Sequence, residues 1–299
     1  MASTKDLRKR ISTTKNTQQT TKAMKMVSAA KLRRAQEAVL AQRPYARRIG
    51  SLIQKVAAQS DSPVQSPLLR RDLTDGFKPK ALLVLVTSDR GLCGPFNAAV
   101  IKAAQKWMMS HSAAYESVEL GFIGRKAYDI FKNRNVKIGP YYKEAGGKVV
   151  FIKSRKVTDD LIEKYLSGQY DEIKFIYNEF KNAASQEIVT ENYLPLEAAD
   201  ALTGRTEIDK MVKDYVVKPS VTQMLETLLA KHFSIQTYRI MLESQASEHG
   251  ARMSAMENAT KNAGEMIRKL TLQYNKQRQA GITKELLEII AGSESQKQA

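Results

Sequence analysis

The sequence predicts an α/β fold in which a small Rossmann-like α/β domain lies between two long helices that pair as an antiparallel coiled coil. Residues 3–56 and 221–274 each repeat a stripe of positions at alternating spacings of four and three residues. Such a seven-residue repeat, sustained over several heptads, is typical of a coiled coil. The segment between them alternates short apolar runs with helical stretches, which is typical of a mainly parallel sheet covered by helices.

Capping signals mark the start of both long helices. Ser3 and Asp6 have the spacing of a capping box, with Asp in place of Glu, and Ser220 and Gln223 have the same spacing before the last helix. Inside the first helical pattern, Pro44 is expected to kink or break the helix, because proline removes a backbone donor and clashes with the preceding turn.

The stripe of the first helix is apolar at both ends but polar from Thr14 to Ser28. Polar residues in the seam of a coiled coil weaken it, so this stretch should be held less firmly than the rest. The surface around it is dense in basic residues, which are Lys5, Arg8, Lys9, Arg10, Lys15, Lys22, Lys25, Lys31, Arg33 and Arg34.

The central segment follows a proline-rich linker and begins with a continuous apolar run, Lys80–Thr87, as expected of a strand buried on both faces. A loop, Ser88–Asn97, then opens a helix that ends near Ser110. Beyond it the patterns predict a strand at 117–123, helices at 125–133 and about 158–166, and strands at 172–177 and 187–193.

Together these signals divide the chain into five parts. They are an N-terminal coiled-coil helix (1–60), a linker (61–79), the α/β domain (80–205), a connector (206–220) and a C-terminal coiled-coil helix with an overhanging tip (221–299). One intervening domain returns the chain, so the long helices are expected to be antiparallel. Setting Val56 against Leu225 keeps both stripes in phase as far as Leu7 and Tyr274.

In this register, residues 277–299 extend past the first helix and have no partner within the chain. The overhang is amphipathic, and its apolar residues are Ile282, Leu286, Leu287, Ile289 and Ile290. An exposed apolar tip on a single helix is unstable in water unless something encloses it. Two interpretations remain open: the tip frays or folds back, or it enters a socket formed by another protein.

Composition narrows the class of protein. The formal net charge is +17, from 48 basic and 31 acidic residues, which indicates an anionic partner such as nucleic acid, an acidic membrane surface or an acidic protein. No run approaches 18 apolar residues, so no membrane span is expected. The single cysteine, Cys93, excludes an intramolecular disulfide, and together these features favour a reduced, cytosolic protein.

No set of residues predicts an active site. The loop Asp89–Asn97 follows a strand and opens a helix, but it lacks both phosphate-binding glycine patterns, so a structural role is favoured. Cys93 has no histidine near it in the sequence, and His232 and His249 lie on the stripe without metal-ligand spacing. We expect no catalytic, cofactor-binding or metal-binding residue.

The basic surface has two interpretations. It could bind nucleic acid, although it lacks interleaved aromatic residues and any known type of DNA-reading helix. A rod with positive sides would equally suit an acidic cavity in a protein, and charge alone does not decide between these partners.

Four segments identify a family. They are residues 20–31 (TTKAMKMVSAAK), 88–94 (SDRGLCG), 248–256 (EHGARMSAM) and 274–290 (YNKQRQAGITKELLEII). In this order they resemble the gamma subunit of F-type (F1Fo) ATP synthases of the bacterial type. The family usually has Gly-Ala after the last segment, where this chain has Gly292-Ser293.

The resemblance implies a central rotor shaft that couples ion flow through a membrane c-ring to ATP synthesis and hydrolysis. The implied partners are the alpha and beta subunits of the alpha3-beta3 ring, the epsilon subunit and the c-ring. Nucleic acid, cofactors and a small-molecule substrate are not implied, because the catalytic sites of this family belong to its partners.

The resemblance also implies contact residues by motif position. Contact with the alpha/beta ring is implied for Met24, Lys25, Arg252, Arg278, Gln279, Thr283 and Glu285. The tip that would turn in a sleeve is Ile282, Leu286, Leu287, Ile289 and Ile290. Tyr215 and Lys218 fall where the family meets the c-ring and epsilon.

Two other classes of function stay open from the residues alone: a basic coiled-coil scaffold for nucleic acid or an anionic membrane surface, and a small α/β enzyme with helical arms. The absence of a transit peptide and of a cysteine pair in the central domain favours a bacterial origin. The implied location is the cytoplasmic face of the bacterial inner membrane, as a peripheral part of the F1 sector.

Overall fold

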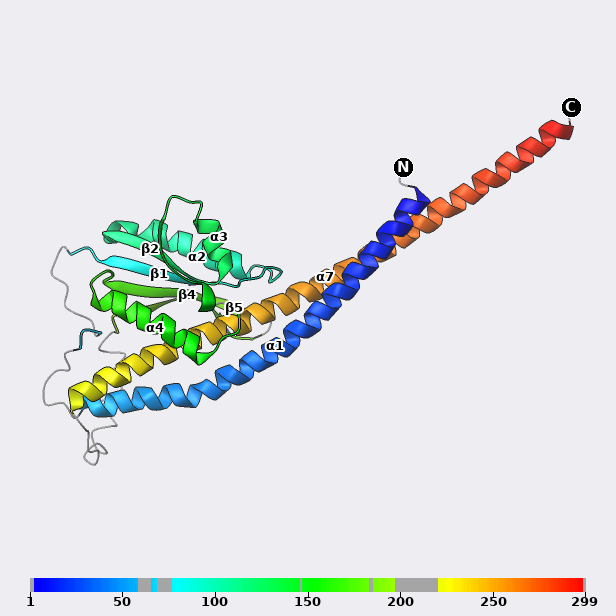
Figure 1. Ribbon diagram of the computed structural model, residues 1–299. Helices are drawn as coiled ribbons and strands as arrows, with labels where there is room; N and C mark the ends of the chain where they lie inside the picture. The colour runs from blue at the N-terminus through cyan, green and yellow to red at the C-terminus, as the bar shows by residue number, and fades with distance from the viewer. Residues whose placement is uncertain are drawn as a thin grey trace. The chain divides into compact units, whose positions relative to one another are not determined.

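The computed structural model describes residues 3–58, 66–68, 77–145, 147–182, 185–196 and 220–297 (Figure 1). Its contacts divide the chain into two compact units. The central unit is Ala29–Arg252, and the terminal unit combines Met1–Ser28 with Met253–Ala299. Two long helices, α1 (Thr4–Ala58) and α7 (Val221–Lys297), contribute to both units.

The central unit contains a five-stranded sheet of strand order β3-β2-β1-β4-β5. Neighbours from β3 to β4 are parallel, and β5 runs antiparallel to β4, which confirms the expected mainly parallel sheet. The strands are β1 (Lys80–Val86), β2 (Ser117–Ile123), β3 (Lys137–Tyr142), β4 (Glu172–Phe180) and β5 (Gln186–Leu194).

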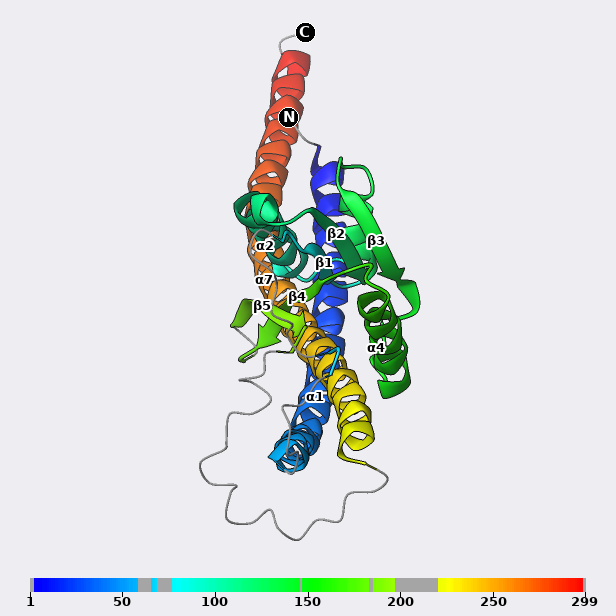
Figure 2. The same ribbon diagram turned by 90° about the vertical axis from the view of Figure 1, so that its left-hand side faces the viewer.

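Among its described residues, this unit also has three shorter helices and two 3-10 turns. They are α2 (Phe96–His111), α3 (Arg125–Phe131), α4 (Phe151–Leu166), η1 (Ser112–Ala114) and η2 (Lys143–Ala145). Figure 2 shows α2 and α4 on opposite sides of the strands.

The sheet is buried on both faces because successive side chains of β1 point to opposite sides. Leu83 and Leu85 pack against α2 and α3. Leu82, Val84 and Val86 pack on the other face, in a core that includes residues of α4, α1 and α7. This double cover explains why β1 reads as a continuous apolar run rather than as an alternating one.

Two elements differ from the sequence-based expectation. The strand β3 was not predicted, because Gly139 and Pro140 in its middle are turn signals. It is an edge strand, where proline is tolerated since one side of the backbone has no ladder to complete. Helix α4 begins at Phe151 rather than at about residue 158, and Val150 at its N-cap makes no side-chain hydrogen bond that a capping signal would have revealed.

In the terminal unit, α1 and α7 pair antiparallel in the predicted register. The Thr260 hydroxyl donates to the Thr21 hydroxyl over 2.8 Å, and the in-phase stripes set these two residues opposite each other. Next to them, Lys25 Nζ lies 3.0 Å from Glu257 Oε1. The seam is therefore polar here, as the sequence indicated.

In the central unit the seam is apolar, with Leu32, Ala35 and Val39 of α1 buried. Gln42 of α1 is a buried polar residue in this seam, and its Nε2 donates to the carbonyl of Ile235 over 3.3 Å. The in-phase register sets Gln42 against the residue one turn further along α7, so the contact agrees with the prediction to within a turn.

Helix α1 continues through Pro44 to Ala58, so the break considered for this position does not occur. Ile49 and Ile53, on the far side of the proline, are buried in the core and hold the helix there. Ser220 caps α7 as expected, because its hydroxyl accepts the backbone N–H of Gln223 over 3.3 Å.

The first testable prediction concerns Gly124, which joins β2 to α3 with φ +89; a Cβ there would lie 1.9 Å from the Thr87 carbonyl oxygen. We expect Gly124→Ala to lower the free energy of unfolding by about 3 kcal/mol or more. Gly168 is the control, because its φ is +77 but nothing lies within 4 Å of the added atom. Gly168→Ala should cost only about 1 kcal/mol. Urea denaturation followed by circular dichroism measures both, and equal losses would contradict the steric explanation.

Candidate functional site

The terminal unit holds a polar notch between α1 and α7, with a volume of about 400 Å³. Gln18 Nε2 donates to the Thr260 carbonyl over 3.4 Å at its edge. The helices approach closely here because α7 has Gly264, where a Cβ would lie 3.0 Å from Gln18 Nε2. The charged residues of its lining are Lys22, Lys25, Lys261 and Glu257.

Of the predicted contact residues, Lys25 lines the notch and Met24 precedes it on α1, and both are half-buried. The hydrogen bond from Lys25 and its charge lower the pKa of Glu257, so this carboxylate is ionised at neutral pH. One acid thus faces three lysines in the notch, which leaves the notch basic. Such a surface favours contact with carboxylates of another molecule.

The C-terminal part of α7 exposes the predicted apolar tip to solvent. The exposed fractions of Ile282, Leu286, Leu287, Ile289 and Ile290 lie between 49% and 67%. The polar contact residues predicted on the same segment, Arg278, Gln279, Thr283 and Glu285, are exposed as well. Since α7 continues to Lys297, the tip is helical and does not fold back on the described part of the chain.

In the central unit, the loop after β1 is held by its own side chains. The backbone N–H of Ser88 donates to Asn97 Oδ1 over 3.0 Å, and Asn97 Nδ2 donates to Cys93 Sγ over 3.1 Å. Cys93 is a buried free thiol. Leu92 has φ 62, a left-handed conformation that is unusual for leucine, and its side chain is exposed. These contacts support the structural role predicted for this loop.

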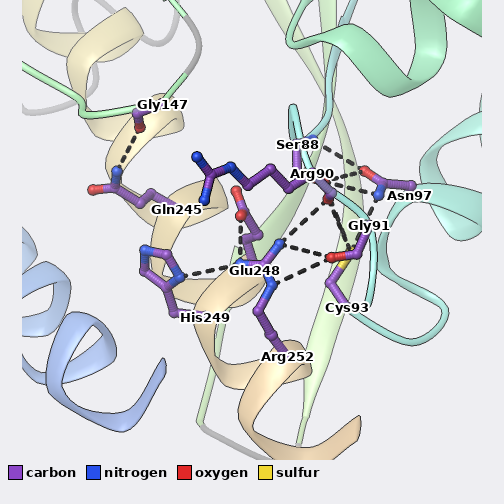
Figure 3. A network of polar contacts seen from close by, with 10 residues as sticks. All are labelled: Ser88, Arg90, Gly91, Cys93, Asn97, Gly147, Gln245, Glu248, His249 and Arg252. Carbon is purple, nitrogen blue, oxygen red and sulfur yellow. Dashed lines mark hydrogen bonds and ion pairs between the residues drawn. The ribbon is translucent and has the colours of Figure 1, made fainter. Parts of the chain in front are cut away.

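Arg252 ties α7 to the same loop (Figure 3). Its Nη2 donates to the carbonyls of Arg90 and Gly91 over 3.3 and 3.2 Å. Its Nη1 donates to Glu248 Oε1 over 2.6 Å and lies 3.4 Å from His249 Nδ1. The residue is only 9% exposed, so most of its guanidinium serves contacts within the chain. Two of the four family segments therefore contact each other through this side chain.

The same loop organises its neighbours. Asp89 Oδ1 accepts the backbone N–H of Arg125 over 3.0 Å and so caps the start of α3. Gly147, where an added Cβ would lie 3.8 Å from Asp89 Oδ2, accepts at its carbonyl from Gln245 Nε2 of α7 over 2.8 Å (Figure 3). The loop is a junction between strand, helix and α7.

Burial and neighbouring charges shift the pKa values of this cluster. Burial, followed by the positive charges of Arg252 and Lys31, lowers the pKa of His249 to about 4. Burial raises the pKa of Glu248, although Arg252 opposes that shift. At neutral pH the imidazole is therefore neutral, and its Nδ1 can accept from Arg252 because a guanidinium only donates.

Sequence reasoning missed the roles of Glu248 and His249, although both stand in a family segment. The spacing of Glu248 and Arg252, four residues apart on one helix, was the available signal for an ion pair. The contact of Arg252 with the loop could not be read from spacing, because it joins residues about 160 positions apart. Tyr215 and Lys218, the predicted c-ring contacts, lie outside the described residues.

These features define a class of protein. Within the described ranges, no three His, Cys, Asp or Glu side chains are grouped so as to hold a metal ion. No helix in the part that the structure describes is long and apolar enough to cross a membrane. A paired helical rod that has a basic notch and an exposed amphipathic end is a stalk-type subunit, built to fit against partner chains.

Comparison with known proteins supports this class. A family model described as ATP synthase matches residues 3–295. The chain is 46% identical to the ATP synthase gamma chain of Geobacter metallireducens over 297 residues, which cover 99% of this chain and 100% of the relative. It is 45% identical to that of Bdellovibrio bacteriovorus over 300 residues, with the same coverage of 99% and 100%.

Solved structures agree on the fold. A chain from the Euglena gracilis mitochondrial ATP synthase, in a structure of OSCP, F1 and c-ring, matches with a TM-score of 0.63 at 21% identity. The match covers 98% of this chain and 94% of that chain. The Euglena rotor in rotational state 1 matches with a TM-score of 0.60 at 20% identity, covering 93% and 98%.

This chain belongs to the family of ATP synthase gamma chains. The family predicted from the four segments is thereby confirmed. A gamma chain is a non-catalytic stalk subunit of the ATPase complex, which accounts for the lack of catalytic groupings in the sequence.

His249 gives the second testable prediction. Its pKa is lower in the folded chain than the ordinary value of 6.5, so neutral His249 favours folding above pH 6.5. This contribution is lost as the pH falls from 6.5 towards 4. In this range the His249 side chain binds a proton in the unfolded chain but not in the folded chain, so protonation favours unfolding. We expect a loss of about 2 kcal/mol, after allowing for partial solvent screening.

The variant His249→Asn keeps an acceptor near Arg252 but cannot titrate, and the nearby carboxylate of Glu248 is common to both proteins. The difference in unfolding free energy between wild type and variant should therefore change across this pH range. Chemical denaturation at pH 7.5, 6, 5 and 4 measures it, and a constant difference would show that His249 is not the titrating group.

Proposed function

We propose that this chain is the central rotor shaft of an F-type ATP synthase. It would couple ion flow through the membrane c-ring to ATP synthesis and hydrolysis in the alpha3-beta3 ring. The single observation that carries this proposal is the helical, solvent-exposed apolar end of α7. A rod end of this kind needs an enclosing sleeve, and a ring of partner subunits supplies one.

The free energy gained by enclosing the apolar tip is compatible with rotation. Five apolar side chains of the tip are each about half exposed, and enclosing the remainder would contribute about 1 kcal/mol for each. Contacts of this kind are not directional, so a helix can turn within an apolar sleeve without losing a fixed set of hydrogen bonds. The tip would thus be retained in its socket and still rotate.

The notch would make the polar contacts with the ring. Met24 and Lys25 would face acidic segments of the beta subunits, and Arg278, Gln279, Thr283 and Glu285 would form a second contact higher on α7. Exposed ion pairs are weak, which allows them to form and break as the shaft turns. Because partner affinity and shaft angle are linked, rotation would change nucleotide affinity in each beta subunit in turn.

Arg252 is part of the proposed contact set, although its guanidinium is engaged within the central unit. We propose that it acts on the ring by holding the loop at Arg90 and Gly91 in place. Tyr215 and Lys218 are proposed as contacts on the c-ring and epsilon side. The five-part division of the chain, with boundaries at 60, 79, 205 and 220, belongs to the same proposal.

As a gamma chain, the protein is a peripheral part of the F1 sector. We place it at the cytoplasmic face of the bacterial inner membrane, in contact with epsilon and the c-ring. The bacterial sources of the two gamma chains compared above support this location. The excess of basic residues fits acidic partner surfaces in this position as well as it would fit nucleic acid.

The third prediction tests the shaft directly. Coexpressed with the other subunits, the chain should copurify with the alpha and beta subunits. A truncation that removes residues 282–299 should lower ion pumping per ATP hydrolysed at least about five-fold, because the sleeve then encloses nothing. Inverted membrane vesicles report pumping, and a coupled-enzyme assay reports ATP hydrolysis.

The matched control removes only residues 292–299, which leaves all five apolar tip residues in place, and it should retain pumping within about two-fold. The proposal fails if the full chain purifies alone and binds DNA with steep salt dependence. It also fails if both truncations behave as wild type.

A further inference from the structure

Three buried hydroxyls join α7 to α4 and β5 in the central unit. The Tyr193 hydroxyl donates to the Phe233 carbonyl over 3.1 Å and lies 2.8 Å from Thr237 Oγ1. The Thr158 hydroxyl of α4 donates to the same Thr237 oxygen over 2.9 Å. Thr158 and Thr237 are 0% exposed. Turning α7 would leave these groups unpaired at a depth where water cannot replace the lost partners.

Two residues beyond Thr237, Arg239 bonds α7 to the sheet. Its Nη2 donates to Glu191 Oε1 over 2.5 Å, and its Nη1 donates to the Tyr177 hydroxyl over 3.1 Å. Tyr177 in turn donates to Glu191 Oε2 over 2.7 Å, which closes a triangle between α7, β4 and β5. A planar guanidinium fixes direction as well as distance.

Two further bonds hold α7 from opposite sides. Gln245 Nε2 donates to the Gly147 carbonyl over 2.8 Å, and the Ser247 hydroxyl donates to the Asn178 carbonyl over 3.1 Å. Residues two positions apart on an α-helix point about 200° apart. Rotation of α7 in either sense would therefore break at least one of these bonds, and Arg252 adds a third direction through the loop.

Helix α1 is held in the central unit in a different way. Leu32, Ala35 and Val39 are buried apolar side chains, and apolar contacts do not specify an angle as hydrogen bonds do. Its buried Gln42 donates to the carbonyl of Ile235, which belongs to α7 itself and not to the sheet.

We propose that the hydrogen bonds along α7 from Phe233 to Arg252, which we call the key, fix this helix to the α/β body. They prevent the helix from turning about its own axis. Thr158, Tyr193, Thr237, Arg239, Gln245 and Ser247 are then positioning residues for torque transfer. Torque that acts on the body passes into α7, a single continuous helix as far as Lys297, and α1 is carried by α7. This inference rests on the proposed rotor function and names the helix that bears the load.

A covalent lock tests whether α7 stays fixed on the body, and it gives the fourth prediction. The hydroxyl oxygens of Thr158 and Thr237 are 2.9 Å apart, so cysteines are introduced at both positions, and a free-thiol assay measures how much disulfide forms. The chain has one native cysteine, and Cys93→Ser removes it as a competing thiol. In the assembled complex, the oxidised disulfide replaces the hydrogen bonds that the two threonines made, so ATP-driven ion pumping should stay within about two-fold of wild type.

Removing hydrogen bonds of the key should instead lower ion pumping. The double variant Gln245→Ala with Ser247→Ala should lower the ions pumped per ATP hydrolysed to about half at temperatures well below melting. The 158–237 disulfide should restore the ratio when oxidised and lose that effect when reduced. Gln42→Met is the matched control, because it removes a buried hydrogen bond to α7 without touching the key, and it should retain the wild-type ratio.

Several outcomes would overturn the inference. They are a lock that stops pumping while ATP hydrolysis continues, a loosened variant that pumps normally, a loss that the lock does not restore, or an equal loss in Gln42→Met. If the double variant does not assemble, Ser247→Ala alone takes its place with the same expected direction. Failure of the unmodified chain to copurify with alpha and beta subunits would instead refute the rotor function itself.

Discussion

The pairing of α1 with α7 is the interaction on which the rest of the structure depends. Neither helix could persist in water over its full length as an isolated chain, because most helical stability in proteins comes from packing of one face. Each unit meets this need differently. The central unit buries Leu32, Ala35 and Val39, whereas the terminal unit pairs Thr21 with Thr260 across a polar seam. The apolar seam of the central unit is strong, but its contacts do not fix the rotation of one helix against the other. The polar seam of the terminal unit is weaker, but it specifies the register.

The two ends of α7 make different kinds of contact, and this difference fits a rotating shaft. Where α7 meets the α/β body, buried polar bonds specify its angle, and a guanidinium and three hydroxyls leave little freedom. At its other end, α7 offers apolar side chains to whatever encloses it, and these specify no angle at all. Fixed attachment at one end and unspecific contact at the other are the two requirements of a helix that must turn inside one partner while moving with another.

The long helices, their register and the buried sheet could be predicted from the sequence, because each leaves a periodic pattern of apolar residues. The heptad stripes predicted both long helices, their antiparallel register and the unpaired tip, and the contact between Thr21 and Thr260 agrees with that register. The apolar run of β1 predicted a sheet covered on both faces. Edge strand β3 was missed because its Gly139 and Pro140 imitate a turn. The contacts of Arg252 with the loop after β1 were missed because no local pattern encodes a bond between residues so distant in sequence.

The central claim is that this chain turns against a catalytic ring. Met109 of α2 is 86% exposed and lies outside both the seam and the key, so a cysteine there can bear an optical probe once Cys93→Ser has removed the native thiol. The measurement is the rotation of this probe on single surface-held alpha3-beta3-gamma complexes supplied with ATP. The account predicts unidirectional rotation at a rate that follows ATP hydrolysis. Hydrolysis at an undiminished rate with a probe that does not turn would contradict it.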